Sequence, residues 1–343
     1  MNCSIVPKFV LLVVGLIMNA GVLIAQPHAG NDLAGSRLQN ELERIAGLAK
    51  GKVGVSAVHL ESGKTVNLNP REAFPMASTV KVAIAVTLFT KIEKGELSLM
   101  TMVDLQPSDL HPGSGTLDVL FAKPGVQLSV QNLLELMMVI SDNSATDILL
   151  RLVGGVSAVR ARLSALGIQG MSVDRTIIEL LADLDGVTLP PPGEWSLGFY
   201  DRLLKSQTSE MVKAAEAKLQ ADPRDTSTPE AMVNLLSQIH SGKALNPEST
   251  ALLLGVMERC RGGLARLKGY LPPGTVVAHK TGSLDANATD DVGIITLPDN
   301  AGHIAIAVFI GKSSQPLAER EQTIAHLTRS IYDYFLFQPS ISR

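Results

Sequence analysis

The hydrophobic and polar pattern near the front of the chain predicts a helix, then a β-hairpin and a second helix. Apolar residues recur at helical spacing over 36–51, and residues 53–60 then alternate in the manner of a strand. The turn-forming segment 61–64 separates this strand from a second one over 65–68. The run 82–89 is hydrophobic on every face, which is typical of a buried helix.

The rest of the chain predicts further helices and then a return to strands. Helical periodicity or capping signals occur over 128–140, 144–153, 156–166, 228–239 and 247–260. Strands and a closing helix are expected over 275–283, 291–297, 303–311 and 316–337. These elements predict an α/β (α+β) fold with a mixed, mostly antiparallel five-stranded sheet and flanking helices. The helical middle, about 96–273, would be an all-helical lobe inserted between the two halves of the sheet.

The N-terminal segment predicts export from the cytoplasm. Lys8 is followed by the apolar run 9–25, so residues 1–25 are typical of a secretory signal peptide. An uncleaved membrane anchor is the alternative, because the run approaches the ~20 residues that span a bilayer. We therefore expect a periplasmic or secreted protein, in which 36–343 form the folded domain. Without the signal, Cys260 would be the only cysteine left, so no internal disulfide is expected.

Composition narrows the class of protein. The chain has 343 residues, of which 45% are hydrophobic and 18% charged, and this balance favours a folded globular protein. The net charge is −3 and the basic residues are scattered, so nothing indicates nucleic-acid binding. The seven histidines and two cysteines show no metal-ligand spacing, so we expect no metal and no other cofactor. We expect a monomer.

Ser78 and Lys81 are the first candidate catalytic pair. They lie three residues apart at the start of the apolar run, so about one helical turn brings the Lys81 amine beside the Ser78 hydroxyl. A serine hydroxyl is a poor nucleophile until a base takes its proton. A lysine can be that base when burial and a helix dipole lower its pKa. The same spacing also arises by chance, so the pair alone does not establish catalysis.

Two tripeptides further along the chain give this pair a context. Ser-Asp-Asn begins at Ser141, directly after a predicted apolar helix, and Lys-Thr-Gly begins at Lys280, inside a predicted strand. Ser-x-x-Lys, Ser-Asp-Asn and Lys-Thr-Gly are the motif set of class A β-lactamases and penicillin-binding proteins. From about Ser36 to the C-terminus the chain therefore resembles these serine hydrolases. Residues 173–176 and 224–229 are similar to the start and the end of the family's omega loop.

The resemblance implies roles for the residues that carry the reaction. Ser78 would attack a carbonyl carbon and form an acyl-enzyme, with Lys81 taking or relaying its proton. The backbone N–H groups of Ser78 and Ser283 would hold the oxyanion. Ser141 would pass a proton to the departing nitrogen. Asp142 is expected to be a structural turn residue.

The resemblance also implies a substrate-binding set. Asn143 would hold the lysine ammonium and the substrate amide. Lys280, with the hydroxyls of Thr281 and Ser283, would bind the substrate carboxylate. Many relatives add an arginine on the strand after Lys-Thr-Gly, and this chain lacks it. Arg266 falls where other relatives supply the guanidinium, although it could equally be a solvated surface arginine.

The chain departs from the family pattern where the acyl group must be removed. The omega-loop glutamate that activates water would fall at Ile177, and a nearby asparagine is replaced by Leu181. Glu179 is two residues further on and could reach inward if the loop register shifts, or it could be part of the loop's structure. The loop also carries an insertion, about 182–223, in which Glu194 could be a replacement base or a surface residue of a proline-rich turn.

These features predict a secreted serine hydrolase that opens the β-lactam amide through an acyl-serine intermediate, with slow or atypical deacylation. One alternative is a penicillin-binding D,D-peptidase that acts on peptidoglycan stem peptides. Another is a receptor that binds β-lactams without hydrolysing them. A serine-dependent amidase such as a glutaminase shares only the first motif. The expected partner is therefore a small β-lactam or a stem peptide.

Overall fold

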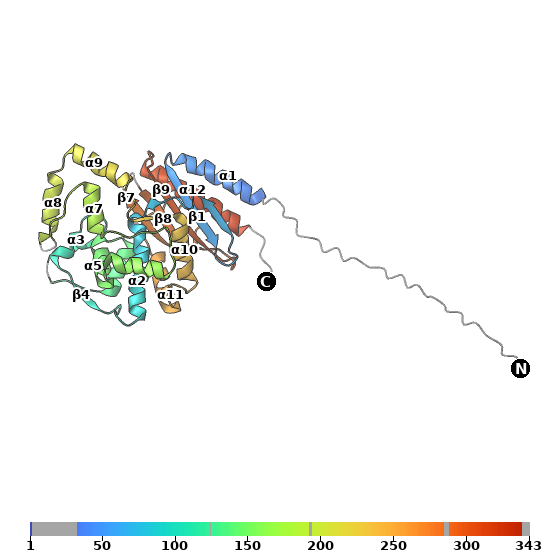
Figure 1. Cartoon of the computed structure of the whole chain (residues 1–343), viewed down its shortest axis with the longest axis horizontal. Coiled ribbons are helices and arrows are strands. Elements are labelled where there is room, and N and C mark those ends of the chain that lie inside the picture. The colour runs from blue at the N-terminus through green and yellow to red at the C-terminus, as the bar shows by residue number, and fades with distance from the viewer. Residues whose placement is uncertain (2–32, 124, 192–193, 285–287, 338–343) are drawn as a thin grey trace. The chain divides into compact units, whose positions relative to one another are not determined.

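The computed structural model describes Met1 and residues 33–123, 125–191, 194–284 and 288–337 (Figure 1). The predicted signal segment falls almost entirely on residues 2–32 and so lies outside the described residues. Residues Ala34–Arg343 form one compact unit. Across the described ranges, no helix has both the length and the apolar character needed to cross a membrane.

A five-stranded sheet is assembled from the two ends of this unit. Its strand order is β2-β1-β9-β8-β7, and every pairing in it is antiparallel. The predicted fold class is confirmed, with strands β1 (Lys52–His59), β2 (Thr65–Leu68), β7 (Val277–Leu284), β8 (Ala288–Thr296) and β9 (His303–Gly311). Strand β8 begins three residues before its expected start at Asp291, because residues 288–290 pair with the end of β7.

Both faces of the sheet are apolar, because each is covered by helices. On β9, Ile304, Ile306 and Val308 pack with helices α1 (Leu33–Leu48) and α12 (Leu317–Leu336) on one side. Ala305, Ala307 and Phe309 pack into the larger core on the other side, which includes α2 (Lys81–Glu93) and α10 (Pro229–His240) (Figure 1). This burial on both faces explains why the sequence of β9 is almost continuously hydrophobic.

Helices fill the chain between β2 and β7. Besides α2 and α10 they are α3 (Leu117–Leu120), α4 (Val130–Val139), α5 (Asn143–Val153), α6 (Gly155–Ala165), α7 (Ile177–Asp185), α8 (Leu197–Lys205), α9 (Ser209–Gln220) and α11 (Pro247–Glu258). Short elements join them: β3 (Phe74–Pro75), β4 (Met102–Asp104), β5 (Gln127–Ser129), β6 (Thr226–Ser227) and the 3₁₀ turns Ala77–Val80 and Pro107–Asp109. Helix α2 is buried from Lys81 to Phe89, as its all-round hydrophobicity predicts.

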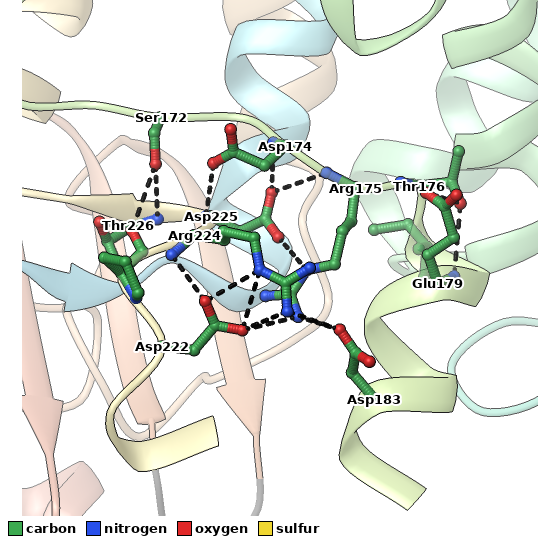
Figure 2. A network of polar contacts seen from close by, with 12 residues as sticks. Ser172, Asp174, Arg175, Thr176, Glu179, Asp183, Asp222, Arg224, Asp225 and Thr226 are labelled. Carbon is green, nitrogen blue, oxygen red and sulfur yellow. Dashed lines mark hydrogen bonds and ion pairs between the residues drawn. The ribbon is translucent and has the colours of Figure 1, made fainter. Parts of the chain in front are cut away.

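The omega-loop insertion contains two helices, α8 and α9, and a partly buried network of ion pairs joins its two ends (Figure 2). The Arg175 guanidinium contacts Asp225 at 2.6 Å, Asp183 at 2.6 Å and Asp222 at 3.0 Å. Arg224 contacts Asp222 at 2.6 Å and Asp183 at 2.8 Å. Because these residues come from both ends of the loop, the network holds the two ends together.

The insertion also packs against the strands that border the catalytic residues. Leu180 of α7 and Leu219 of α9 form an apolar cluster with Leu284 of β7 and Ala288 of β8. Ala77, which precedes Ser78, belongs to the same cluster. The loop is therefore anchored beside the Ser-x-x-Lys turn by apolar packing as well as by charge.

Candidate active site

Ser78 lies in a tight turn at the N-terminal end of α2. It is partly buried within the 3₁₀ turn Ala77–Val80, and Ala77 has a left-handed backbone with φ of 45°. Strand β7 passes so close that a Cβ atom on Gly282 would lie 2.6 Å from the Met76 carbonyl oxygen. A left-handed alanine is uncommon and costs free energy, so the surrounding packing must hold this turn in place.

Lys81 begins α2 and is fully buried. Its amine donates to the Ser141 backbone oxygen at 2.6 Å, to the Ser141 hydroxyl at 3.0 Å and to Asn143 Oδ1 at 3.2 Å. Burial, and then the positive charge of Lys280, lower the pKa of Lys81 well below its ordinary value. This lowering shifts Lys81 toward the neutral amine, the form that can accept a proton.

The Ser141 hydroxyl stands between two lysines. Lys280 Nζ lies 3.1 Å from Ser141 Oγ and also donates to the Thr281 carbonyl at 2.9 Å. Burial lowers the pKa of Lys280 to about 8. Because Ser141 Oγ accepts from both amines, its own O–H bond is free to point elsewhere. Ser141 has φ of 62°, a left-handed conformation.

The loop that precedes α3 wraps the Ser-Asp-Asn motif. Asp142 accepts hydrogen bonds from the backbone N–H groups of Thr116 at 2.7 Å and Leu117 at 3.0 Å, and its other oxygen caps α5. Asn143 Nδ2 donates to the Pro112 carbonyl at 3.0 Å. The structural role expected for Asp142 is confirmed, and the same loop orients the amide that contacts Lys81.

Arg266 lies against β7 and is buried, so the solvated alternative is wrong. Its guanidinium donates to the Ser283 hydroxyl at 2.8 Å and to the carbonyls of Gly282 and Asp290, each at 2.8 Å. Glu321 contacts its Nε at 3.1 Å. The residue next to the Lys-Thr-Gly motif, Ser283, is exposed, and Thr281 beside it is largely buried. A guanidinium therefore stands at the end of the row of polar groups on β7.

Glu179 does not point its carboxylate toward the catalytic serine. It closes a capping box at the start of α7, where it accepts from the Thr176 N–H at 2.8 Å and the Thr176 hydroxyl at 2.9 Å. Glu179 is exposed, and Ile177 is buried in the core. The proposed inward shift of Glu179 is therefore not supported, because the capping box uses the side chain. Glu194 is likewise exposed, as expected of a surface residue.

Asp147 occupies the position beside Ile177, and sequence reasoning missed it. Its carboxylate accepts from the N–H groups of Ile177 at 2.8 Å and Ile178 at 3.0 Å. Burial raises the pKa of Asp147 to about 6, although these amides and the nearby Lys81 oppose the rise. A sequence signal did exist, because Asp147 follows Asn143 by four residues and so lies on the same face of α5.

Trp195 anchors the insertion to the loop that holds Asn143. Its indole N–H donates to the Leu110 carbonyl at 3.1 Å. Its ring lies 5.7 Å from that of His111 and 5.4 Å from that of Tyr200. His111 is buried, and its backbone N–H donates to the Ser144 hydroxyl at 2.8 Å. The insertion is thus coupled to the Ser-Asp-Asn segment.

Lys81 and Lys280 both contact Ser141, and Ser78 lies three residues before Lys81 at the start of a buried helix. This arrangement suits a serine hydrolase that forms an acyl-enzyme. The profile of the beta-lactamase enzyme family matches residues 37–335. The chain belongs to this family and is a hydrolase of the serine β-lactamase type.

Individual relatives agree with this assignment. The beta-lactamase VEB-1 of Pseudomonas aeruginosa is 29% identical, over 86% of this chain and 89% of its own length. The extended-spectrum beta-lactamase PER-1 of the same organism is 29% identical, over 87% of each chain. The crystal structure of a beta-lactamase from Chitinophaga pinensis matches with a TM-score of 0.72 and 31% identity, over 87% of this chain and 98% of its own.

Proposed function

We propose that this chain is an exported hydrolase that is acylated by β-lactams at Ser78 and releases the acyl group slowly. Neutral Lys81 takes the proton of the Ser78 hydroxyl as its oxygen bonds to the β-lactam carbonyl carbon. The carbon–nitrogen bond then breaks, and Ser141 passes a proton to the leaving nitrogen. The position of Ser141 Oγ, 3.0 Å from the Lys81 amine, supports this relay.

The carboxylate of the substrate would bind along β7. Lys280, Arg266 and the hydroxyls of Thr281 and Ser283 offer positive charge and hydrogen bonds there, and bonds between charged groups are the stronger kind. The backbone N–H groups of Ser78 and Ser283 would hold the oxyanion, and one such donor typically contributes about 3–4 kcal/mol to the lowering of the barrier. Asn143 would contact the substrate amide.

The position of Glu179 is the observation that supports slow deacylation. Its carboxylate serves the capping box of α7, and the residue at the expected base position, Ile177, is buried and apolar. General base catalysis is typically worth about 10²–10⁴-fold, so a site without a placed omega-loop carboxylate should hold its acyl-enzyme for longer. The same observation favours the second candidate, a penicillin-binding D,D-peptidase acting on stem peptides.

Stopped-flow mixing with a chromogenic cephalosporin, followed by intact mass measurement, tests the proposal. We expect a burst of about one equivalent, an adduct on Ser78 and a slow steady state. The Ser78→Ala variant should show neither burst nor adduct, whereas Ser157→Ala on α6 should behave as wild type. A fast steady state without a burst would reject slow deacylation. Release of D-alanine from a stem-peptide mimic would support the D,D-peptidase.

A further inference from the structure

Resting on the proposed function, we propose that Asp147 is a positioning residue that acts through Lys81. Its carboxylate stabilises the ammonium that forms when Lys81 takes a proton, first from Ser78 and later from the water that attacks the acyl-enzyme. Lys81 would then be the base of both half-reactions, and Asp147 would supply the negative charge that the omega loop does not.

Asp147 lies on the same face of α5 as Asn143, which contacts Lys81. Asn143 and Asp147 are one helical turn apart, and Asn143 Oδ1 is 3.2 Å from the Lys81 amine. The Asp147 side chain is buried, with 8% of its surface exposed. Asp142, the N-cap of α5, also raises the pKa of Lys81, and the N–H groups of the wrapping loop and of α5 use both of its oxygens.

The surroundings of Asp147 hold its carboxylate in place, and with a pKa of about 6 it is mostly ionised at pH 7. The N–H groups of Ile177 and Ile178 at the N-terminus of α7 donate to its two oxygens, and a helix N-terminus favours an anion. His111 Nε2 lies 3.4 Å from Asp147 Oδ2. Burial lowers the pKa of His111 to about 4, so this imidazole is neutral at pH 7. Glu179 is the remaining charged group near Asp147.

The charges around Lys81 oppose each other. Burial and the Lys280 cation on β7 lower the pKa of Lys81, and Asp142 and Asp147 raise it. A base works best when its pKa is close to the working pH, so a lysine whose pKa is lowered too far would be a weak proton acceptor. Asp147 limits that fall. Removing its charge should therefore lower the pKa of Lys81 further and weaken it as a base.

The chemistry of the second half-reaction is balanced within these groups. The oxygen of a water bonds to the acyl carbon while one water proton moves to the Lys81 amine. The bond from the acyl carbon to Ser78 Oγ then breaks, and this oxygen takes the proton back from the Lys81 ammonium. Asp147 gains no proton and touches no substrate atom. It acts by its charge alone.

The test compares Asp147→Asn with Glu179→Gln, which removes a carboxylate from the same helix start. Acylation by a cephalosporin and loss of the Ser78 adduct are each measured between pH 4.5 and 9. For Asp147→Asn we expect both rate constants to fall about tenfold or more, and the acidic limb of the acylation profile to move to lower pH. Glu179→Gln should leave both rate constants at pH 7 unchanged.

A purely structural role would lower rates without moving the acidic limb, so an unmoved limb in folded Asp147→Asn overturns the proposal. If that variant does not fold, Asp147→Glu keeps the charge and should keep the wild-type limb, and a moved limb there overturns the proposal equally. Loss of deacylation in Glu179→Gln would assign the role to Glu179 instead. Failure of the wild type to form any adduct would reject the proposed function itself, which is a separate outcome.

Discussion

The fully buried Lys81 amine donates a hydrogen bond to the partly buried Ser141 hydroxyl at 3.0 Å. A buried amine that contacts a hydroxyl can hand it a proton without going through solvent. This contact joins the Ser-x-x-Lys and Ser-Asp-Asn motifs, which are 60 residues apart in the chain. It gives Lys81 a route, through Ser141, for passing on the proton that it takes from Ser78.

Lys81→Met should remove the base, because it replaces the amine with an apolar side chain of similar length. We expect acylation by a cephalosporin to fall about 10²–10⁴-fold, which is the usual contribution of a general base. The second-order rate constant for appearance of the Ser78 adduct, measured by intact mass, checks this. Lys91→Met on the same helix is the control, because Lys91 only forms a surface ion pair with Glu96. This variant should be acylated at the wild-type rate. Equal rates in wild type and Lys81→Met would contradict the assignment.

Arg266→Ala should weaken recognition of the substrate carboxylate. Hydrogen bonds to charged groups contribute about 1.5–3 kcal/mol, so we expect the acylation rate constant to fall about 10- to 100-fold. Arg259→Ala is the matched control, since Arg259 is exposed and paired with Glu135. Titration with penicillins that carry or lack the free carboxylate separates the effects. An equal loss for both would instead indicate damage to the carbonyl contacts on β7.

The sequence predicted the sheet, most helices and the three motifs, because each depends on local periodicity or on a short spacing. Asp147 was missed because its partners, the amides of Ile177 and Ile178, come from a segment some 30 residues away. The burial of Arg266 could not be predicted from the sequence either, because it depends on how the chain before β7 packs against that strand. For Glu179 a local signal was available. Thr176 and Glu179 have the Ser/Thr-x-x-Glu spacing of a capping box. This local pattern predicts the observed contact, whereas comparison with the family's omega-loop glutamate does not.

The raised pKa of Asp147 makes a prediction for stability against pH. Its carboxyl has a pKa of about 6 in the folded chain and an ordinary value of 3.8. As the pH rises from about 4 to 6 the unfolded chain loses this proton first, so the folded state loses stability. The wild type should lose up to about 3 kcal/mol relative to Asp147→Asn over this range, because one pKa unit corresponds to about 1.4 kcal/mol. Urea unfolding at pH 4 and 7 measures the difference, and Glu179→Gln, which keeps Asp147, should retain most of the wild-type loss.

Arg175→Leu should release the omega-loop insertion from the rest of the fold. The Arg175 side chain is 5% exposed and contacts three carboxylates. Its loss leaves Asp225 without its cation, while Asp183 and Asp222 keep only the half-exposed Arg224. Removing one partner of a buried ion pair typically costs about 3–5 kcal/mol. Arg160→Leu is the control, because Arg160 is half-exposed and its ion pair with Asp174 should contribute little.

Trp195 reports on the insertion directly, since it is the only tryptophan in the chain and packs against His111. In the wild type and in Arg160→Leu, its fluorescence and the far-ultraviolet circular dichroism should change at the same urea concentration. In Arg175→Leu the fluorescence change should come at lower urea than the loss of helix, because the insertion would open before the two-sided core around the sheet unfolds. Coincident, unshifted transitions in Arg175→Leu would mean that the apolar cluster around Leu180, Leu219 and Leu284 holds the insertion without the ion pairs.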